Sequence, residues 1–201
     1  MVNTGETCIA AKRFIIPEGI ADAFLGRFKS EFEKLKPGDP MAPETSLGPL
    51  CTAGALDNVL KQIDTAIKGG AKVLLGGKKL DRRGFFLEPT ILTDVQPDNP
   101  AYNQEFFAPV AMVFRVKNEK EAVELANDSP YGLGATVITQ DVEHGKRIAR
   151  QIDSGMVFIN ERTGTAPELP FGGVKNSGYG RELSRLGIGE FVNKKLIRVA
   201  A

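Results

Sequence analysis

The chain has 201 residues, 42% of them hydrophobic and 25% charged, and its 26 Lys and Arg nearly balance its 25 Asp and Glu. This composition indicates an ordinary globular protein, and a net charge of +1 provides no long-range field to attract a nucleic acid or an anionic membrane. Two cysteines and one histidine exclude a disulfide scaffold and leave a Cys and His zinc site one ligand short, so we expect no metal. No apolar run could span a bilayer and the N-terminal residues do not resemble a signal peptide, which together predict a cytoplasmic protein.

Short β-branched or aromatic runs alternate with longer amphipathic runs along the chain, and this alternation predicts an α/β fold with a mostly parallel sheet. A glycine-containing turn followed by good helix formers places Cys8 near the start of a helix. The other predicted helices run from Pro17 to Leu35, from Thr52 to Gly69, from Asn118 to Leu125 and from Asp141 to Gln151.

Strands are predicted between these helices, at residues 72–75, 110–116, 134–138 and 156–160. The third helix lies between two of them, which makes a βαβ unit. A long polar loop rich in glycine and proline follows residue 160, and loops of this kind often carry functional sites. The tail at residues 194–200 suits a strand, which could pair either with its own sheet or with a neighbouring subunit.

Cys8 is the candidate nucleophile, because free N–H groups at a helix start favour a thiolate. The alternative is an inert buried cysteine, the commoner fate of an isolated Cys. Cys51 has no such setting and is interpreted as inert. His144 lies among charged residues typical of a solvated helix face, and we therefore discount it as a catalytic base.

Four segments together carry a resemblance to a known family, and they occur in its order and spacing. The chain resembles the catalytic half of the aldehyde dehydrogenase superfamily, and within it the bacterial and archaeal succinate semialdehyde dehydrogenases. The four segments are Asn-Thr-Gly-Glu-Thr-Cys at residues 3–8, Gln-Glu-Phe-Phe-Ala-Pro-Val at 104–110, Asn-Asp-Ser-Pro-Tyr-Gly-Leu at 127–133, and Pro-Phe-Gly-Gly-Val-Lys-Asn-Ser-Gly-Tyr-Gly-Arg-Glu at 170–182.

The resemblance implies a three-layer catalytic domain over residues 1–189 and an oligomerisation tail over residues 190–201. It also implies that the Rossmann cofactor domain which precedes this region in the family is absent from the chain. None of the glycine clusters has the spacing of a dinucleotide-binding or phosphate loop. The implied partners are a small aldehyde, NAD or NADP, and further copies of the chain in a homo-oligomer.

The resemblance also assigns roles to individual residues. Cys8 would attack the aldehyde carbonyl through its sulfur and support the oxyanion through its backbone N–H. Considered singly, Glu105 could be any loop carboxylate, Phe107 part of a core pair, and Glu182 a surface ion-pair member. The implied site comprises Cys8 and Glu182 in catalysis, Glu105 and Phe107 against the nicotinamide ribose and ring, and Thr7, Ile9 and Phe171 along the aldehyde path.

The sequence departs from the family pattern in three places. Glu6 stands where Gln is more frequent, and Ala108 stands where Gly is usual, which would cost about 1 kcal/mol if the backbone there needed a positive φ. Val2 occupies the position of an arginine that holds the substrate carboxylate in many succinate semialdehyde dehydrogenases. Arg162 is an alternative cation, although a solvated loop residue is the simpler interpretation.

The leading hypothesis is the catalytic-cysteine domain of an NAD(P)-dependent aldehyde dehydrogenase, with succinate semialdehyde as the candidate substrate. We expect the isolated chain to be inactive, because the family's general base, one oxyanion donor and most of the cofactor surface lie in the missing half. The alternative is a non-enzymatic association module with an idle cysteine. A thiol peroxidase or transferase would need a base that His144 is badly placed to supply.

Overall fold

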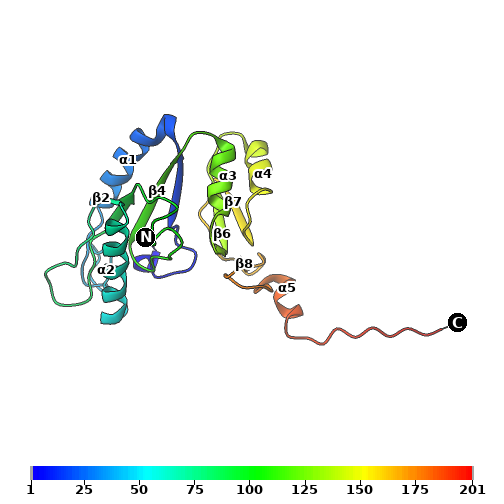
Figure 1. Cartoon of the computed structure of the whole chain (residues 1–201). Helices are drawn as coiled ribbons and strands as arrows, with labels where there is room; N and C mark the ends of the chain where they lie inside the picture. The colour runs from blue at the N-terminus through cyan, green and yellow to red at the C-terminus, as the bar shows by residue number, and fades with distance from the viewer. Residues whose placement is uncertain (1, 201) are drawn as a thin grey trace. The chain divides into compact units, whose positions relative to one another are not determined.

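A computed structural model describes residues 2–200 and divides the chain into two compact units, one ending at Ser129 and the other beginning at Pro130. The first unit contains a four-stranded sheet in the order β1-β4-β3-β2 (Figure 1). Its elements are a 3-10 helix (Val2–Gly5), β1 (Arg13–Pro17), α1 (Glu18–Glu33), α2 (Ala53–Lys68), β2 (Lys72–Leu75), β3 (Thr90–Thr93), β4 (Val110–Val116) and α3 (Glu119–Asn127).

The sheet of the first unit is parallel except at one edge. β1 and β3 both run parallel to the central β4, whereas β2 pairs with β3 in the antiparallel sense. Every residue of β4 except Arg115 is buried, as expected for a strand with a layer on each face. The mostly parallel α/β prediction is therefore confirmed.

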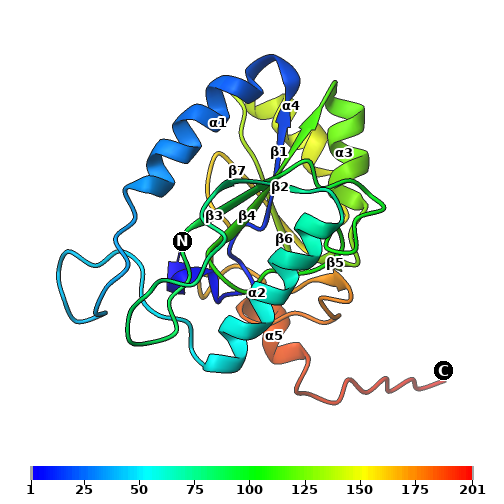
Figure 2. The same ribbon diagram turned by 60° about the vertical axis from the view of Figure 1, so that its left-hand side comes forward.

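Two apolar clusters form the layers on the two faces of this sheet. On one face Met112 and Phe114 of β4 belong to the cluster that contains the buried side of α2, with Leu125 of α3 packed against it. On the other face Ala111 and Val113 belong to the cluster that contains Phe32 of α1. Since neighbouring residues of a strand point to opposite faces, helix, sheet and helix form three layers (Figure 2).

Helix α2 begins where the sequence predicts, because the Thr52 hydroxyl oxygen accepts a hydrogen bond from the Ala55 N–H at 3.0 Å. Its buried face follows helical spacing, whereas Ile67 near the end of the helix is 46% exposed. The residues that α2 buries are Leu56, Val59, Ile63 and Ala66.

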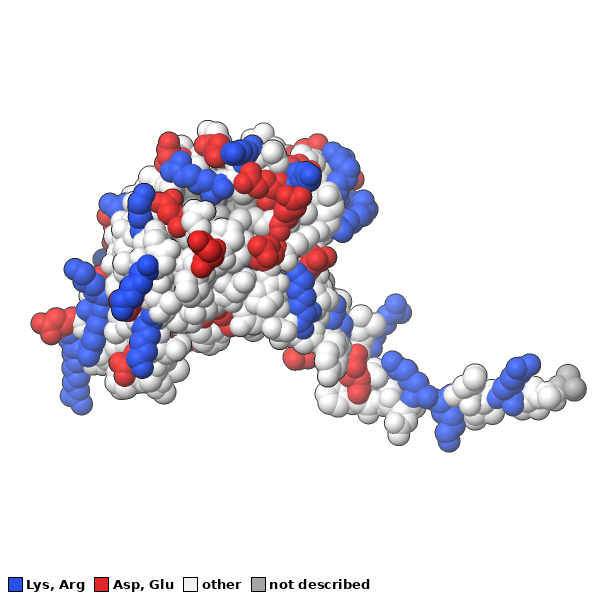
Figure 3. Space-filling model, viewed as in Figure 1, with Lys and Arg blue, Asp and Glu red and all other residues white. Residues whose placement is uncertain are grey.

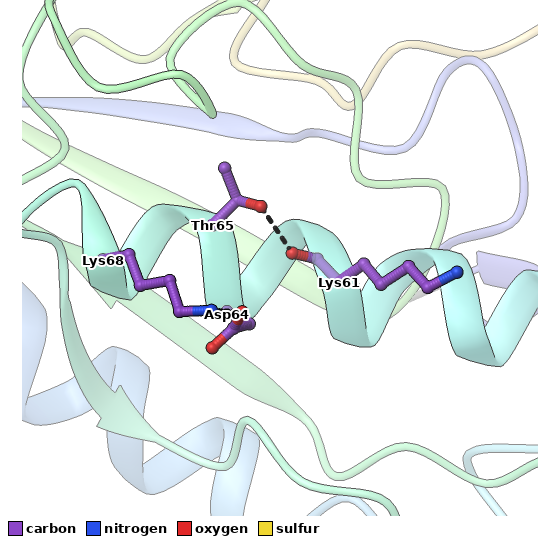
Figure 4. Close-up of polar contacts among 4 residues, drawn as sticks. All are labelled: Lys61, Asp64, Thr65 and Lys68. Carbon is purple, nitrogen blue, oxygen red and sulfur yellow. Dashed lines mark hydrogen bonds and ion pairs between the residues drawn. The ribbon is translucent and has the colours of Figure 1, made fainter.

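The opposite side of α2 carries local polar contacts (Figure 4). The Lys68 ammonium lies 2.5 Å from an oxygen of Asp64, one turn earlier, and both side chains are largely exposed. The Thr65 hydroxyl donates to the Lys61 carbonyl at 2.8 Å. Polar side chains of this kind are typical of a solvent-exposed helix face, and their contacts contribute little to the stability of the fold.

Helix α3 is capped by Asn118, the residue at which the sequence predicts the helix to begin. The side-chain oxygen of Asn118 accepts from the Glu121 N–H at 2.9 Å. The carboxylate of Glu121 accepts in turn from the Lys117 N–H at 2.8 Å, one residue before the position that a reciprocal capping box would use.

The second unit contains two small sheets (Figure 1). β6 and β7 pair in parallel with α4 between them in sequence, and β5 pairs antiparallel with β8. Asn160 clamps the turn after β6, since its side chain accepts from the Thr139 N–H and donates to the Thr139 carbonyl, each at 2.8 Å. The elements are β5 (Tyr131–Gly132), β6 (Gly134–Val137), α4 (Val142–Ala149), β7 (Met156–Ile159), β8 (Val174–Lys175) and α5 (Ser184–Gly189).

Two local predictions are wrong. No helix begins at Cys8: the residue lies in a turn, and the chain then enters strand β1. Phe14, Ile15 and Ile16 pair with β4, and this distant partner overrides the helix propensity of the preceding residues. The βαβ unit predicted around α3 does not form either, because β4 and β6 belong to different sheets. The tail at residues 194–200 is exposed and pairs with none of the described residues, so its pairing with a neighbouring subunit stays a prediction.

Charges of both signs are interspersed on the face shown in Figure 3, in keeping with the near-zero net charge. Within residues 2–200, no helix is long and apolar enough to cross a membrane. In the same range, no group of three or more His, Cys, Asp or Glu side chains is placed to hold a metal ion.

Candidate active site

Cys8 lies on a tight turn that follows an unusual stretch of backbone. Asn3, Thr4 and Gly5 have φ values of 48°, 57° and 78°, three successive left-handed residues. The Ala10 N–H then donates to the Thr7 carbonyl at 3.1 Å, which closes a turn around Cys8. The thiol is exposed at this turn rather than buried in the core.

The backbone N–H of Cys8 is an available donor. Among residues 2–200, no protein acceptor pairs with this N–H. A free N–H next to an exposed sulfur is the arrangement that an oxyanion formed at that sulfur requires.

Gly5 packs directly against the segment that carries Glu105 and Phe107. A Cβ on Gly5 would lie 2.2 Å from the Ala108 carbonyl oxygen and 3.0 Å from the Pro109 nitrogen. Only glycine fits this approach, and the positive φ at Gly5 favours glycine as well. The structure thus brings the Cys8 turn and the Glu105 segment into contact.

Two neighbouring phenylalanines in this segment have opposite environments. Phe106 is fully buried in the core, whereas Phe107 is 44% exposed, so the two do not form a core pair. Glu105 is half-buried, and its carbonyl accepts from the Gln62 side chain at 3.1 Å. Ala108 has no positive φ, so alanine is unstrained where the family usually has glycine.

Lys12 lies between the two segments. Its ammonium donates to the Gly5 carbonyl at 2.5 Å and lies 5.0 Å from the centroid of the Phe107 ring. Burial lowers the pKa of Lys12, while the charges of Glu105, Cys8 and Glu6 oppose that shift.

Glu6 anchors the turn on its other side. Its two carboxylate oxygens accept from the Cys51 N–H at 3.1 and 3.2 Å, just before the first turn of α2. A hydrogen bond between the Cys51 thiol and the same carboxylate raises the pKa of Cys51. This shift is consistent with the prediction of an unreactive Cys51.

In the second unit, Phe171 and Glu182 form a backbone pair. The Phe171 N–H donates to the Glu182 carbonyl at 2.8 Å, and the Glu182 N–H donates to the Phe171 carbonyl at 2.6 Å. The Arg181 guanidinium donates to the carbonyls of Gly173 and Gly180 at 2.9 and 2.6 Å. Arg181 therefore braces this hairpin instead of pairing with Glu182 on the surface.

Phe171 also lines an open cavity of about 240 Å³ within the second unit. Most of its lining is apolar, which suits a hydrocarbon chain better than a charged group. The cavity is lined by Gly155, Met156, Val157, Phe158, Gly164, Leu169, Pro170 and Phe171.

The predicted site residues therefore form two groups. Thr7 and Ile9 flank Cys8 on its turn, partly exposed, in the unit that also carries Glu105 and Phe107. Sequence reasoning missed Lys12 and Gln62. Lys12 was missed because the segment around Cys8 was predicted to be a helix. No sequence signal marks Gln62, which reaches Glu105 only through the packing of α2.

The first unit is a three-layer α/β domain, and it carries the exposed Cys8, the half-buried Glu105 and the exposed ring of Phe107. The chain belongs to the aldehyde dehydrogenase family, whose sequence model matches residues 1–197.

Individual members of the family differ in how similar they are to this chain. The chain is 50% identical to a succinate-semialdehyde dehydrogenase [NADP(+)] of Deinococcus radiodurans over 98% of its own length and 41% of that protein. It superposes on the succinic semialdehyde dehydrogenase of Streptococcus pyogenes, solved with NADP+, with a TM-score of 0.96 and 47% identity over 98% of this chain and 44% of that one. For the betaine aldehyde dehydrogenase of Staphylococcus aureus, solved with NAD+, the TM-score is 0.91 and the identity 33%, over 94% and 38% of the two chains. The chain thus spans less than half the length of each of these relatives.

Proposed function

We propose that the chain is the catalytic-cysteine part of an NADP-dependent aldehyde dehydrogenase that oxidises succinate semialdehyde, with Cys8 as the nucleophile. The observation that carries the proposal is the packing of Gly5 on Ala108, which brings the turn with the exposed Cys8 against the segment that carries Glu105 and Phe107. The names of the relatives from D. radiodurans and S. pyogenes support the choice of aldehyde and cofactor.

In this proposal the Cys8 thiolate attacks the aldehyde carbon and a tetrahedral thiohemiacetal forms on the sulfur. The free N–H of Cys8 stabilises the negative oxygen that develops there. Loss of hydride from that carbon leaves a thioester on Cys8, which water hydrolyses to release the carboxylate.

The residues present suit a nicotinamide ribose. The half-buried Glu105 offers two acceptor oxygens for hydroxyl groups, and the exposed face of Phe107 offers an apolar surface for a planar ring. When bound, the oxidised nicotinamide supplies the hydride acceptor. We propose that Glu182 and Phe171, paired on their hairpin, serve proton exchange and the aldehyde path, and that Thr7 and Ile9 contact the aldehyde.

We further propose that the isolated chain does not turn over, since its relatives are more than twice as long. The test is NADPH or NADH formation from succinate semialdehyde by the purified chain, with Cys8→Ser as the control. We expect no turnover. Sustained turnover that Cys8→Ser abolishes would show that the residues of this chain suffice for the reaction.

Cys8 chemistry can be tested without turnover. Succinate semialdehyde should slow the alkylation of Cys8 by iodoacetamide through reversible thiohemiacetal formation, while succinate should not. The Cys51 peptide, resolved in the same mass spectrum, is the internal control. Equal protection of both cysteines, or protection of neither, would contradict the assignment of Cys8 as nucleophile.

We also propose that the chain forms homo-oligomers through its tail. Phe191, Leu196, Ile197 and Val199 are each at least 79% exposed, an apolar surface typical of an interaction segment. Sedimentation of the chain and of a form that ends at Gly189 should show association only in the longer one. Association without any Cys8 reactivity would favour the alternative, a non-enzymatic interaction module. A cytoplasmic location stays a prediction from the sequence.

A further inference from the structure

Helix α2 and the residues that lead into it contact both segments of the candidate site. Just before the helix, the Cys51 N–H donates to the carboxylate of Glu6, in the turn that carries Cys8, at 3.1 and 3.2 Å. In the middle of the helix, the side-chain nitrogen of Gln62 donates to the Glu105 carbonyl at 3.1 Å. Because the buried face of α2 belongs to the apolar core of this unit, the helix is a rigid frame for both segments.

A second amide joins α2 to the cofactor segment from the opposite direction. Asn99, which is 3% exposed, donates from its side chain to the Ala66 carbonyl of the helix at 2.8 Å. A Cβ on Gly69, at the end of α2, would lie 2.6 Å from the Asn99 side-chain nitrogen, so a larger residue there would displace this amide. Gln62 and Ala66 are one helical turn apart and share a face. The two amides therefore hold the segment that leads to Glu105 at two points along α2.

The hydrogen bond from Gln62 fixes the direction of its amide group. The amide oxygen is buried and has no partner among residues 2–200. If the amide were turned over, this oxygen would face the Glu105 carbonyl oxygen, and two acceptors would meet with no hydrogen between them. The contact therefore requires the N–H donor of Gln62, and a side chain of the same length without a donor cannot replace it.

We propose that Gln62 is a positioning residue, which fixes the main chain of Glu105 against α2 and thereby sets where the Glu105 carboxylate meets the hydroxyls of a nicotinamide ribose. The inference rests on the cofactor role proposed for Glu105 above. Gln62 acts through Glu105 and is assigned no contact with the cofactor itself. Since the residue before α2 is bonded to Glu6, the same helix aligns the Cys8 turn with this carboxylate.

The test follows the modification of Glu105 by a carbodiimide and glycine ethyl ester on the full chain, measured for each peptide by mass spectrometry. Gln62→Met keeps the length and helix propensity of the side chain but removes the donor. The half-buried Glu105 should then react about three- to tenfold faster, the factor that one hydrogen bond contributes. Gln151→Met is the matched control, because Gln151 donates to the Arg147 carbonyl at the same 3.1 Å but in the second unit, and it should leave the Glu105 rate unchanged.

Three further readouts separate a positioning role from a general loss of stability. Gln62→Lys keeps an N–H donor within reach, so Glu105 should react within about twofold of the parent rate. Nicotinamide mononucleotide, which carries the ribose hydroxyls, should protect Glu105 in the parent, whereas nicotinamide alone should not. In Gln62→Met, the concentration of mononucleotide that gives half protection should be about three- to tenfold higher. Hydrogen exchange within α2 should be the same in all variants.

The inference would be overturned by a Glu105 rate in Gln62→Met that equals the parent rate. It would also be overturned if Gln62→Lys reacted as fast as Gln62→Met, because the donor would then not be what holds Glu105. Faster hydrogen exchange throughout α2 in Gln62→Met would assign Gln62 a role in helix stability alone, which contradicts a positioning role.

Failure of this inference is distinguishable from failure of the proposed function. The rate without nucleotide measures how firmly Glu105 is held, whereas protection by the mononucleotide measures whether Glu105 meets a ribose. A Gln62 effect on the rate, without any protection in the parent, would overturn the cofactor role of Glu105 on which the inference rests. Protection that is insensitive to Gln62→Met would refute only the inference.

Discussion

The two units of the chain are stabilised in different ways. The first unit buries apolar side chains on both faces of its sheet, and Phe106, Ile91 and Leu92 are completely inaccessible. Among the described residues of the second unit, Met156 has the one apolar side chain that is buried, and the other buried residues are glycines. There, backbone pairs, side-chain clamps and close glycine contacts replace the apolar core.

This difference predicts how each unit responds to change. A buried apolar core loses several kcal/mol when a large side chain is removed, because a cavity remains. The stability of a unit held by close backbone contacts should fall when a substitution adds atoms, and should change less when a substitution removes apolar atoms. It should also open more easily than a unit with a large apolar core.

The largest expected effect is that of Phe106→Ala, which should destabilise the first unit by about 3–5 kcal/mol, since Phe106 fills the centre of the core. Met156→Ala in the second unit, where Met156 is 8% exposed, should cost less than half as much. Denaturant unfolding monitored by hydrogen exchange would assign each loss to its unit. Equal losses would remove the contrast between the units.

Next in size is Gly155→Ala, which adds a single methyl group to the second unit. Its Cβ would lie 2.0 Å from the Gly172 carbonyl oxygen, so the hairpin that carries Phe171 must move. We expect a loss of about 2–3 kcal/mol confined to residues 130–190. Gly19→Ala, where α1 has open space, is the control and should be neutral or stabilising. Undisturbed exchange in the Phe171 hairpin would count against the close-contact description.

A smaller effect is expected for Tyr102→Phe, at about 1 kcal/mol, because the hydroxyl donates to Asp128 at 2.8 Å. Burial, followed by this bond to Asp128, raises the pKa of Tyr102. The stability that neutral Tyr102 contributes is therefore fully present below about pH 10 and declines as the pH rises through its raised pKa. Urea unfolding from pH 8 to pH 11 should show wild type and variant converging at the alkaline end. A constant difference would mean that the hydroxyl does not titrate in the folded state as described.

The smallest expected effect is that of Lys68→Met on α2. Lys68 and Asp64 lie one helical turn apart, and both side chains are largely exposed (Figure 4). Loss of this ion pair should therefore lower the free energy of unfolding by about 0.3 kcal/mol. Thermal unfolding in low and high salt would measure this, and the difference should vanish in 0.5 M salt. A loss above about 1 kcal/mol would show that this helix face contributes more than its exposure suggests.

The parts of the fold that sequence predicts are those determined by neighbours in the chain. Helix α2 and the Asn118 cap follow from spacing and from contacts within one turn. β1 could not be predicted in this way, because Phe14 and Ile15 become a strand only by pairing with β4. β3, with four residues, lies between β4 and β2 and depends on both for its hydrogen bonds.

In the candidate site, too, some features follow from neighbouring residues in the sequence and others only from the folded chain. Cys8, Glu105 and Phe107 were proposed from motifs, and the structure adds their contact through Gly5 and Ala108. The exposure of Phe107 next to the burial of Phe106 has no local signal, because both are phenylalanines in the same short segment. Lys12 and Gln62 were not identified, since each acts through a segment that only the packed chain brings near.

The pairing of β1 with β4 also has a consequence in time. Phe14 lies opposite Val113, so β1 can pair with β4 only after about 100 further residues have been synthesised. At translation rates of about 5–20 residues per second, this interval lasts on the order of 5–20 s. During synthesis the Cys8 thiol therefore emerges well before the Glu105 segment against which its turn packs. A newly made chain should pass through a stage in which this cysteine is open to oxidants, and thiol-labelling of ribosome-bound chains stopped before and after residue 116 would reveal when that stage ends.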